Sequence, residues 1–519
     1  MRKWQVLLAF LLLAATSCKE TPAEVAPSLK SVSVVEKTLA LPRGGSAEMH
    51  FSVTDAGFRF GGLRDVVLSF PSAGDAAACR LADVRSDSPE GHYIAVLEDT
   101  GGDASYSLQL RLGVRTSPGS EAMVLSEPFE VSNGGAPSAG PDTGLPVVRI
   151  ETSGGKAIVN KVDWIPSKMT IEGTEYACSV RGRGNSTWEW RKKPYAVKLD
   201  KKAEVLGMPA HKRWVLLANF VDRTMMRNIV SMKVASLTSL AWTPRCKSVE
   251  LVLNGVHQGN YLLIEQVKVD KNRVAIDADE GFMLELDFHY DNEIQWMDPN
   301  GRCNQFGKGI PFGIKHPDPE DITAEQVAKI KEYVTTVSNV LYGKDFADPV
   351  EGYAKYLDVA SFIDYWIVFE VMGNHELGNP GSVYMHRDKD GLLTAGPCWD
   401  FDWGVLSYKT SPQARTGLIN AKAIWYERLF ADPAFRSAVK ARFNELLPAL
   451  QEIPVFMEET ERELARSAAL NFDMWNPAED ASMNGGSIIN GDERMSFHDA
   501  SVQLREVFEE RLKVIAKSL

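Results

Sequence analysis

The stretch "GPCWDFDWG", residues 396–404, places Asp400 and Asp402 among two tryptophans and a phenylalanine. Burying a carboxylate among such apolar side chains costs free energy unless a cation, a proton or a hydrogen-bond donor compensates its charge. Two acids with this spacing and these neighbours therefore indicate a metal site, a proton-transfer site or a structural hydrogen-bonding role.

A β-hairpin is expected directly before these acids. The segments "SVYMHR" and "LLTAGPCW" read as strands, and "DKDG" between them is a strong turn signal. A two-residue loop at 390–391 would pair Ser382 with Trp399 and Gly381 with Asp400. The loop that precedes the hairpin and the acids that follow it would then meet at the same end.

The side chains expected at that end are oxygen donors. They are Asn374, Glu376, Ser382, Asp400 and Asp402. Carboxylate, amide and hydroxyl oxygens suit a hard cation such as Mg²⁺ or Mn²⁺, and no zinc-like spacing is present. Paired carboxylates beside tryptophans would also suit a glycoside hydrolase. That interpretation assigns no role to the glycine-rich segment earlier in the chain.

This glycine-rich segment, "RGRGNSTWEWRKKPYAVKLD", covers residues 181–200. Gly184 and Ser186 belong to a loop with several backbone and hydroxyl donors, and such loops can surround phosphates. The strand-like "PYAVKLD" follows and directs Lys198 away from its apolar face, as expected for a lysine that reaches into a nucleotide cleft. Taken alone, the segment is better explained as a turn followed by a solvated strand lysine.

Glu265 is the one acid inside the apolar run "YLLIEQV". It could contact a ligand in a cleft, or it could pair with a cation such as Lys198 or Arg183. A structural ion pair is the more conservative interpretation.

The elements that must position these residues change along the chain. Residues 31–133 alternate apolar and polar side chains between Gly, Asp and Ser clusters, which predicts a β-sandwich of Ig-like type. Residues 134–145 are rich in Gly, Pro and Ser and read as a linker. Residues 146–519 begin with strands and end in helices, so the predicted fold class is α+β with two domains.

Four helices are expected in the second domain. "DRTMMRNIVSMKVASLTSL" has Asp222 as a candidate N-cap, and "TAEQVAKIKEYVTTVSNVLY" carries a capping box of Thr323 and Gln326. "DVASFIDYWIVFEVMG" is apolar nearly all round and should be buried, and "SVQLREVFEERLKVIAKSL" has one apolar stripe.

The composition is that of a globular protein, with 519 residues and a net charge of −12. An acidic surface repels phosphate backbones, and no basic cluster stands out in the sequence, so nucleic acid is not expected as a partner. Five cysteines lie beyond the first twenty residues, without metal-ligand spacing, and isolated thiols are expected rather than an assignable disulfide. These are Cys79, Cys178, Cys246, Cys303 and Cys398.

The first residues resemble an export signal. Arg2 and Lys3 precede an apolar run at 4–15, and the small residues that follow end at Cys18. The pattern resembles a bacterial lipoprotein signal at 1–18 followed by a polar tether at 19–30. We therefore expect an exported protein whose lipidated Cys18 anchors it to the cell envelope, and no other membrane contact.

Several motifs in order resemble one family. "RGRGNSTW", "KKPYAVKL", "WVLLANFVDRTMMRN", "GNYLLIEQVKVD" and "GPCWDFDWG" together resemble the CotH spore-coat kinases, over roughly residues 145–519. The likeness is greatest to the lipoprotein members of Bacteroides-type bacteria. This resemblance implies an atypical protein-kinase-like fold, ATP with Mg²⁺ or Mn²⁺ as cofactors, and a location on the periplasmic or surface face of a Gram-negative outer membrane.

The resemblance also implies roles for individual residues. Arg183, Gly184 and Ser186 would lie over the phosphates of ATP, and Lys198 would position the α- and β-phosphates. Asp400 would hold the metal.

Asp402 would lie beside Asp400 as a further candidate ligand, and Glu265 is a candidate nucleotide contact. Glu376 and Ser382 stand where the family usually has aspartate and asparagine. The extra methylene of glutamate displaces its carboxylate by about 1.5 Å, and misplacement near 1 Å can cost roughly 10²-fold in rate.

The expected function is thus phosphotransfer from ATP to serine or threonine hydroxyls of a protein, with Glu376 orienting the acceptor. The alternative is an inactive pseudokinase that serves as a surface module binding a polymer or a partner protein. A glycoside hydrolase is the third interpretation.

Overall fold

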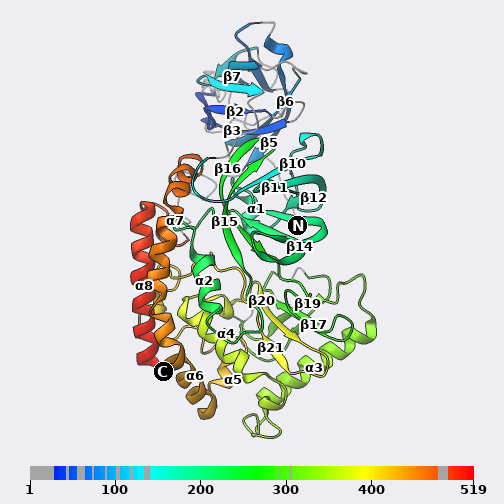
Figure 1. Ribbon diagram of the computed structural model, residues 1–519, viewed down its shortest axis with the longest axis vertical. Coiled ribbons are helices and arrows are strands. Elements are labelled where there is room, and N and C mark those ends of the chain that lie inside the picture. Colours follow the sequence, from blue (N-terminus) through cyan, green and yellow to red (C-terminus); the bar gives the residue numbers. More distant parts are fainter. Residues whose placement is uncertain are drawn as a thin grey trace, which may run out of the picture.

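The computed structural model describes residues 29–41, 46–54, 65–72, 75–87, 91–100, 106–116, 121–133, 141–289, 292–303, 307–476 and 489–519. The predicted signal with Cys18, most of the tether, and residues 134–140 of the linker lie outside these described residues. Both helices and sheets are present, so the α+β class is confirmed. Figure 1 shows three tiers, with the N-terminal sheets at one end, a barrel in the middle, and a sheet with helices at the other end.

The described residues between 29 and 133 form two sheets around one apolar core, as the alternation predicts. Met49, Phe51, Leu110 and Leu112 are among the buried residues of this core. The first sheet contains β1 (Ser31–Val34), β3 (Ser46–Thr54), β6 (His92–Asp99) and β5 (Cys79–Asp87) in this order. The second contains β2 (Thr38–Ala40), β9 (Phe129–Asn133), β7 (Tyr106–Arg115) and β4 (Val66–Ser69), with β8 (Met123–Leu125) also paired to β7.

A closed barrel follows, in which β10 pairs with β11 on one side and with β15 in parallel on the other. Its interior is filled by apolar side chains, among them Val180, Val197 and Trp214. Its strands in order around the barrel are β10 (Val147–Thr152), β11 (Ile165–Ile171), β12 (Thr174–Gly182), β13 (Tyr195–Val205), β14 (Met208–Leu217), β16 (Val256–Glu265) and β15 (Cys246–Leu253). The short helix α1 (Ser186–Glu189) lies in the loop between β12 and β13.

The last tier packs a second sheet against helices around the largest apolar core. The sheet order is β18 (Gln295–Asp298), β19 (Ile310–His316), β17 (Phe282–Leu286), β20 (Val383–Arg387) and β21 (Leu393–Ala395). The helices are α2 (Arg227–Ala235), α3 (Ala324–Tyr342), α4 (Val359–Val371), α5 (Tyr426–Leu429), α6 (Pro433–Leu450), α7 (Ile453–Met474) and α8 (Phe497–Ser518). The long α7 and α8 lie side by side along one flank (Figure 1).

The local predictions hold in part. The capping box of Thr323 and Gln326 at the start of α3 is confirmed, and α4 is buried along nearly its whole length. Asp222 is not an N-cap, because α2 begins only at Arg227 after Met226.

The predicted register of the hairpin is wrong by one residue. Met385 pairs with Ala395 and Arg387 with Leu393, and the ladder ends there. The turn is longer than two residues, with Asp390 in the left-handed region at φ 56° and a hydrogen bond from the Gly391 N–H to the Asp388 carbonyl. The residues from Gly396 to Asp402 therefore lie in a loop beyond β21 rather than in the strand.

The cysteines and the helices add two observations. Cys79, Cys178, Cys246, Cys303 and Cys398 are free thiols in the described part of the chain. No helix among the described residues carries an apolar stretch of the length and hydropathy needed to span a bilayer.

A fully buried ion pair joins α8 to α4. The Arg511 guanidinium contacts the Glu370 carboxylate and also donates to the carbonyls of Ala414 and Gly417, at 2.6 and 2.8 Å. The Glu370 carboxylate accepts further hydrogen bonds from the backbone of the 419–420 segment. One arginine therefore holds three separate segments of the last tier together.

We expect Arg511→Ala to destabilise the protein by about 3–5 kcal/mol, because it leaves the Glu370 carboxylate buried without its cation. Chemical denaturation measures this change. Lys513→Ala, at an exposed site on the same helix, should change stability by less than about 0.5 kcal/mol. Similar stability of the two variants would contradict this account of the ion pair.

Candidate active site

The loop after β21 sends its apolar side chains into the core and leaves its two acids at the core boundary. Phe401 is fully buried, and its ring packs against Phe369 with ring centroids 4.7 Å apart. Asp400 has a left-handed backbone at φ 64°, and Asp402 is buried. Burial raises the pKa of both carboxyl groups, and the charge of Asp400 further raises the pKa of Asp402.

Glu376 joins these acids from the turn that follows α4. The Asn374 side chain fixes this turn by accepting a hydrogen bond from the Glu376 N–H at 2.8 Å. Burial, and then the charges of Asp400 and Asp402, raise the pKa of Glu376 well above its ordinary value. The Oε2 atom of Glu376 is buried and has no hydrogen-bond partner among the described residues. The charges of Asp400 and Asp402 therefore act on Glu376.

Arg183 brings positive charge to this cluster from the glycine-rich loop. Its guanidinium lies 5.8 Å from the centre of the Trp399 ring, and its charge lowers the pKa of Asp400 and of Asp402 against the effect of burial. Trp190, at the other end of the loop, stacks on Trp403 with centroids 6.1 Å apart. We call residues 396–406, which carry the two aspartates, the acid loop. The glycine-rich loop therefore contacts the acid loop on both sides of the aspartates.

The conformation of this loop requires a glycine at position 184. Gly184 has φ 91°, and a Cβ atom there would lie 2.0 Å from the Thr187 hydroxyl. Ser186 follows at the start of α1 with an exposed side chain.

Two of the predicted site residues, Lys198 and Ser382, form no hydrogen bond or ion pair with these acids among the described residues. Lys198 is exposed on the outer face of the barrel, between Ser179 and Arg213 on the neighbouring strands. Ser382 is half-buried with φ 58° directly before β20. No group of three His, Cys, Asp or Glu side chains in the described ranges has the arrangement of a metal site. The roles predicted for Lys198 and Ser382 stay predictions.

Glu265 is buried in an ion-pair network. Its carboxylate accepts hydrogen bonds from Arg273 at 2.6 Å and from the Arg245 backbone at 2.8 Å, and the Arg245 guanidinium lies 3.2 Å away. These contacts agree with the interpretation of Glu265 as a member of a structural ion pair. The partners predicted for it, Lys198 and Arg183, are wrong, because the barrel places two other arginines beside it.

The sequence patterns above missed three further polar residues near the acids: Tyr384, Glu285 and Asp287. Tyr384 donates a hydrogen bond of 2.7 Å to Glu285, which also forms an ion pair of 3.0 Å with Lys315. The charge of Glu285 acts to raise the pKa of Asp400, and that of Asp287 acts to raise the pKa of Glu376. Glu285 is an acid inside the apolar run "FMLEL", the same signal that identified Glu265.

The comparisons with known proteins agree with the motifs. The family model described as "CotH kinase protein" matches residues 180–515. The chain belongs to this family. No curated protein matches the chain.

Solved structures add no argument. One match is the S-layer protein SbsC, domains 5–6, with 11% identity, 46% of this chain and 97% of that chain covered, and a TM-score of 0.18. Another is a marsupial T cell receptor, with 13% identity, 36% and 97% covered, and a TM-score of 0.17. TM-scores this low support no conclusion about the fold of this CotH-family chain.

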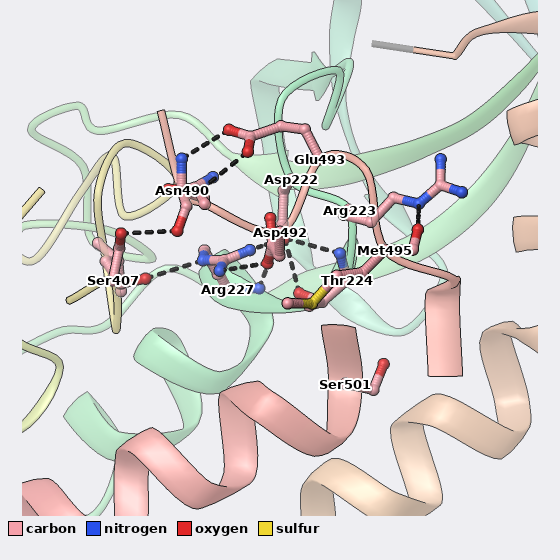
Figure 2. A network of polar contacts seen from close by, with 12 residues as sticks. Asp222, Arg223, Thr224, Arg227, Ser407, Asn490, Asp492, Glu493, Met495 and Ser501 are labelled. Atoms are coloured by element: carbon pink, nitrogen blue, oxygen red, sulfur yellow. Dashed lines mark hydrogen bonds and ion pairs between the residues drawn. The ribbon is translucent and has the colours of Figure 1, made fainter. Parts of the chain in front are cut away.

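A buried arginine ties the acid loop of this CotH-family chain to α2. Figure 2 shows Arg227 between Asp222 and Asp492, with N–O distances of 2.5 and 2.6 Å. Its Nε donates to the Val405 carbonyl at 2.8 Å. Although burial opposes it, the charges of Asp492 and Asp222 raise the pKa of Arg227. Two carboxylates from distant segments therefore keep this cation in place beneath the loop.

Two asparagines bind the backbone of the same loop. Asn490 donates to the Asp402 carbonyl at 3.2 Å and accepts from the Gly404 N–H at 2.8 Å. Asn228, on α2, accepts from the Phe401 N–H at 2.9 Å. The loop that carries the acids is thus fixed by side chains from α2 and from a segment near the C-terminus.

We expect Asp402→Asn to stabilise the cation-free protein at pH 8 by on the order of 1 kcal/mol, because it removes one of three buried like charges. The pKa of Asp402 is raised in the folded state. The unfolded chain therefore ionises first, and wild-type stability should fall as pH rises above the ordinary carboxyl range. Urea denaturation between pH 5 and 8, about the usual stable range, measures both effects. Asp345→Asn, at an exposed site, is the matched control. A wild-type profile no steeper than that of Asp402→Asn would contradict the raised pKa.

We expect Asn490→Ala to loosen the acid loop, at a cost of about 1–2 kcal/mol, because the buried Gly404 N–H and Asp402 carbonyl lose their partner. Hydrogen exchange followed by mass spectrometry should show faster exchange in peptides covering residues 400–406. Arg494→Ala changes an exposed neighbour and should leave this exchange unchanged. Equal protection in both variants would show that Asn490 does not fix the loop.

Proposed function

We propose that this CotH-family chain transfers the terminal phosphoryl group of ATP to serine or threonine hydroxyls of a protein. The observation that carries the proposal is that Glu376, Asp400 and Asp402 act on one another electrostatically, and that Arg183 of the glycine-rich loop acts on the two aspartates. Phosphoryl transfer depends on positioning and on stabilising negative charge, which is what such a cluster can supply around a bound nucleotide.

The acid cluster fits a divalent cation. Three carboxylates have raised pKa values, Arg183 supplies a counter-charge to Asp400 and Asp402, and one buried oxygen of Glu376 has no partner in the described part. Mg²⁺ or Mn²⁺ is commonly held by one or two carboxylates together with substrate phosphates. Asp400 and Asp402 would hold the cation, with Ser382 as a further candidate ligand. Such a cation, when bound, would neutralise phosphate charge.

The residues of the chain then take the following roles in the proposal. Arg183, with the loop backbone at Gly184 and the hydroxyl of Ser186, faces the phosphates. Glu376 accepts a hydrogen bond from the acceptor hydroxyl and orients it. We assign no nucleotide contact to Glu265, because two arginines already occupy its carboxylate.

The barrel above and the helix-covered sheet below correspond in this proposal to the two lobes of an atypical protein-kinase-like fold. The Ig-like assignment of the N-terminal sheets belongs to the proposal as well. So does the anchoring of an exported chain to the cell envelope through a lipid on Cys18.

A second candidate function is a pseudokinase that binds a surface polymer or a partner protein. Two observations favour it. Lys198 is exposed on the outer face of the barrel, and position 376 holds a glutamate where the family usually has an aspartate. In this case the site still binds a nucleotide with its cation, but no phosphoryl group is transferred.

The experiment measures transfer of labelled γ-phosphate to protein acceptors with Mg²⁺ or Mn²⁺, together with the thermal shift on adding ATP. We expect Asp400→Ala to reduce transfer by on the order of 10³-fold, equivalent to about 4 kcal/mol. Asp345→Ala, an exposed acid in the same tier, is the matched control. A thermal shift without transfer would favour the pseudokinase. The absence of both in the wild type would refute nucleotide chemistry.

A further inference from the structure

Strand pairing gathers cations that are scattered in the sequence onto one outer face of the barrel. Lys198 on β13 pairs with Ser179 on β12 and with Arg213 on β14, and in the next row Arg181 pairs with Ala196. Residues paired across antiparallel strands share a face. Their neighbours Val180, Val197 and Trp214 fill the barrel interior, so these cations lie outside. We call Arg181, Lys198 and Arg213 the cationic row.

Trp164 lies at the edge of the cationic row, directly before β11. The Arg181 guanidinium lies 4.6 Å from the centre of its ring, and the Arg213 guanidinium lies 5.1 Å away. The small side chain of Ala196 between these strands leaves room for Arg213 to reach across. Trp164 precedes the residues that the family model matches, so this cluster includes a residue from outside the matched region.

The cationic row lacks acidic partners. None of its three members forms a salt bridge with any carboxylate that the structure describes, and the buried Nε of Arg181 has no hydrogen-bond partner there. The nearest acid to act on Arg213 is Asp318, from the tier below. Residues 147–217 contain 14 Lys and Arg but only 7 Asp and Glu, although the whole chain has a net charge of −12. Such a local excess of positive charge fits an anionic ligand.

The cationic row leads to the acid cluster. Arg183 follows Arg181 by two residues, which is about 6.6 Å along a strand, and its charge acts on Asp400 and Asp402. Arg213 is farther from Arg183 than Arg181 is, because its row of paired residues lies two residues further along the strands. An extended triphosphate with its ribose, at about 1.5 Å per bond, spans on the order of 10 Å. A nucleotide with its phosphates at Arg183 would therefore place its nucleoside near Trp164.

We propose that Trp164, Arg181 and Arg213 bind the ribose and base of the nucleoside triphosphate whose phosphates face Arg183 and the acids. This inference rests on the proposed function and specifies where the nucleoside end lies. Guanidinium planes stack on flat aromatic rings, so two arginines against an indole can extend that stack onto a nucleobase. A polyphosphate alone would gain nothing from such stacking.

The test compares two probes on the full-length chain by isothermal titration, ATP with Mg²⁺ and tripolyphosphate with Mg²⁺. We expect Arg213→Gln and Trp164→Ala to weaken ATP binding by about tenfold or more and to leave tripolyphosphate binding within about twofold. Arg183→Gln should weaken both ligands. Lys212→Gln removes an exposed charge beside Arg213 and is the matched control that should change neither.

Three results would overturn the inference. Equal weakening of both ligands by Arg213→Gln would make the cationic row a general polyanion site, suited to an acidic acceptor protein. Unchanged ATP binding in Arg213→Gln and Trp164→Ala would place the base elsewhere. Failure of the wild type to bind either ligand would refute the proposed function itself, a result distinct from the other two. If Trp164→Ala does not fold, Arg213→Gln decides the question alone.

Discussion

Like charges held close together at the edge of an apolar core are the constraint around which this site is built. Asp400 and Asp402 cannot withdraw to solvent, because Phe401 between them is anchored in the core. Burial and mutual repulsion raise the pKa of Asp402, and Glu376 meets the same penalty from the opposite side. A folded chain tolerates such repulsion only if other interactions fix the backbone that carries the charges.

Those interactions come from segments that are far apart in the sequence. The acid loop donates hydrogen bonds to Asn228 on α2 and to Asn490 near the C-terminus, and it accepts one from Arg227 on α2. Arg227 is itself held by two carboxylates, just as Arg511 is held by Glu370 of α4. In both places a buried arginine with several oxygen partners joins elements that apolar contacts alone would leave free to shift.

Patterns within short stretches of sequence predicted much of this architecture, and pairings between distant stretches escaped them. The capping box at Thr323 and the alternation around Phe51 depend on neighbours in the chain, so they could be read directly. Turn chemistry brought Glu376 towards Asp400 despite a register wrong by one residue. The clustering of Arg181 with Arg213 follows from strand pairing through β13, and Arg245 and Arg273 reach Glu265 from loops beside β15 and β16, which no pattern within a short stretch encodes.

The distribution of charge also constrains how a nucleotide would enter the proposed site. A free triphosphate would meet the carboxylates of Glu376, Asp400 and Asp402, and like charges close together repel strongly where water is scarce. The cationic row attracts the same ligand from the outer side of the barrel. Attraction at one end and repulsion at the other favour a nucleotide that arrives already paired with a divalent cation, so nucleotide and metal affinities at this site should be coupled.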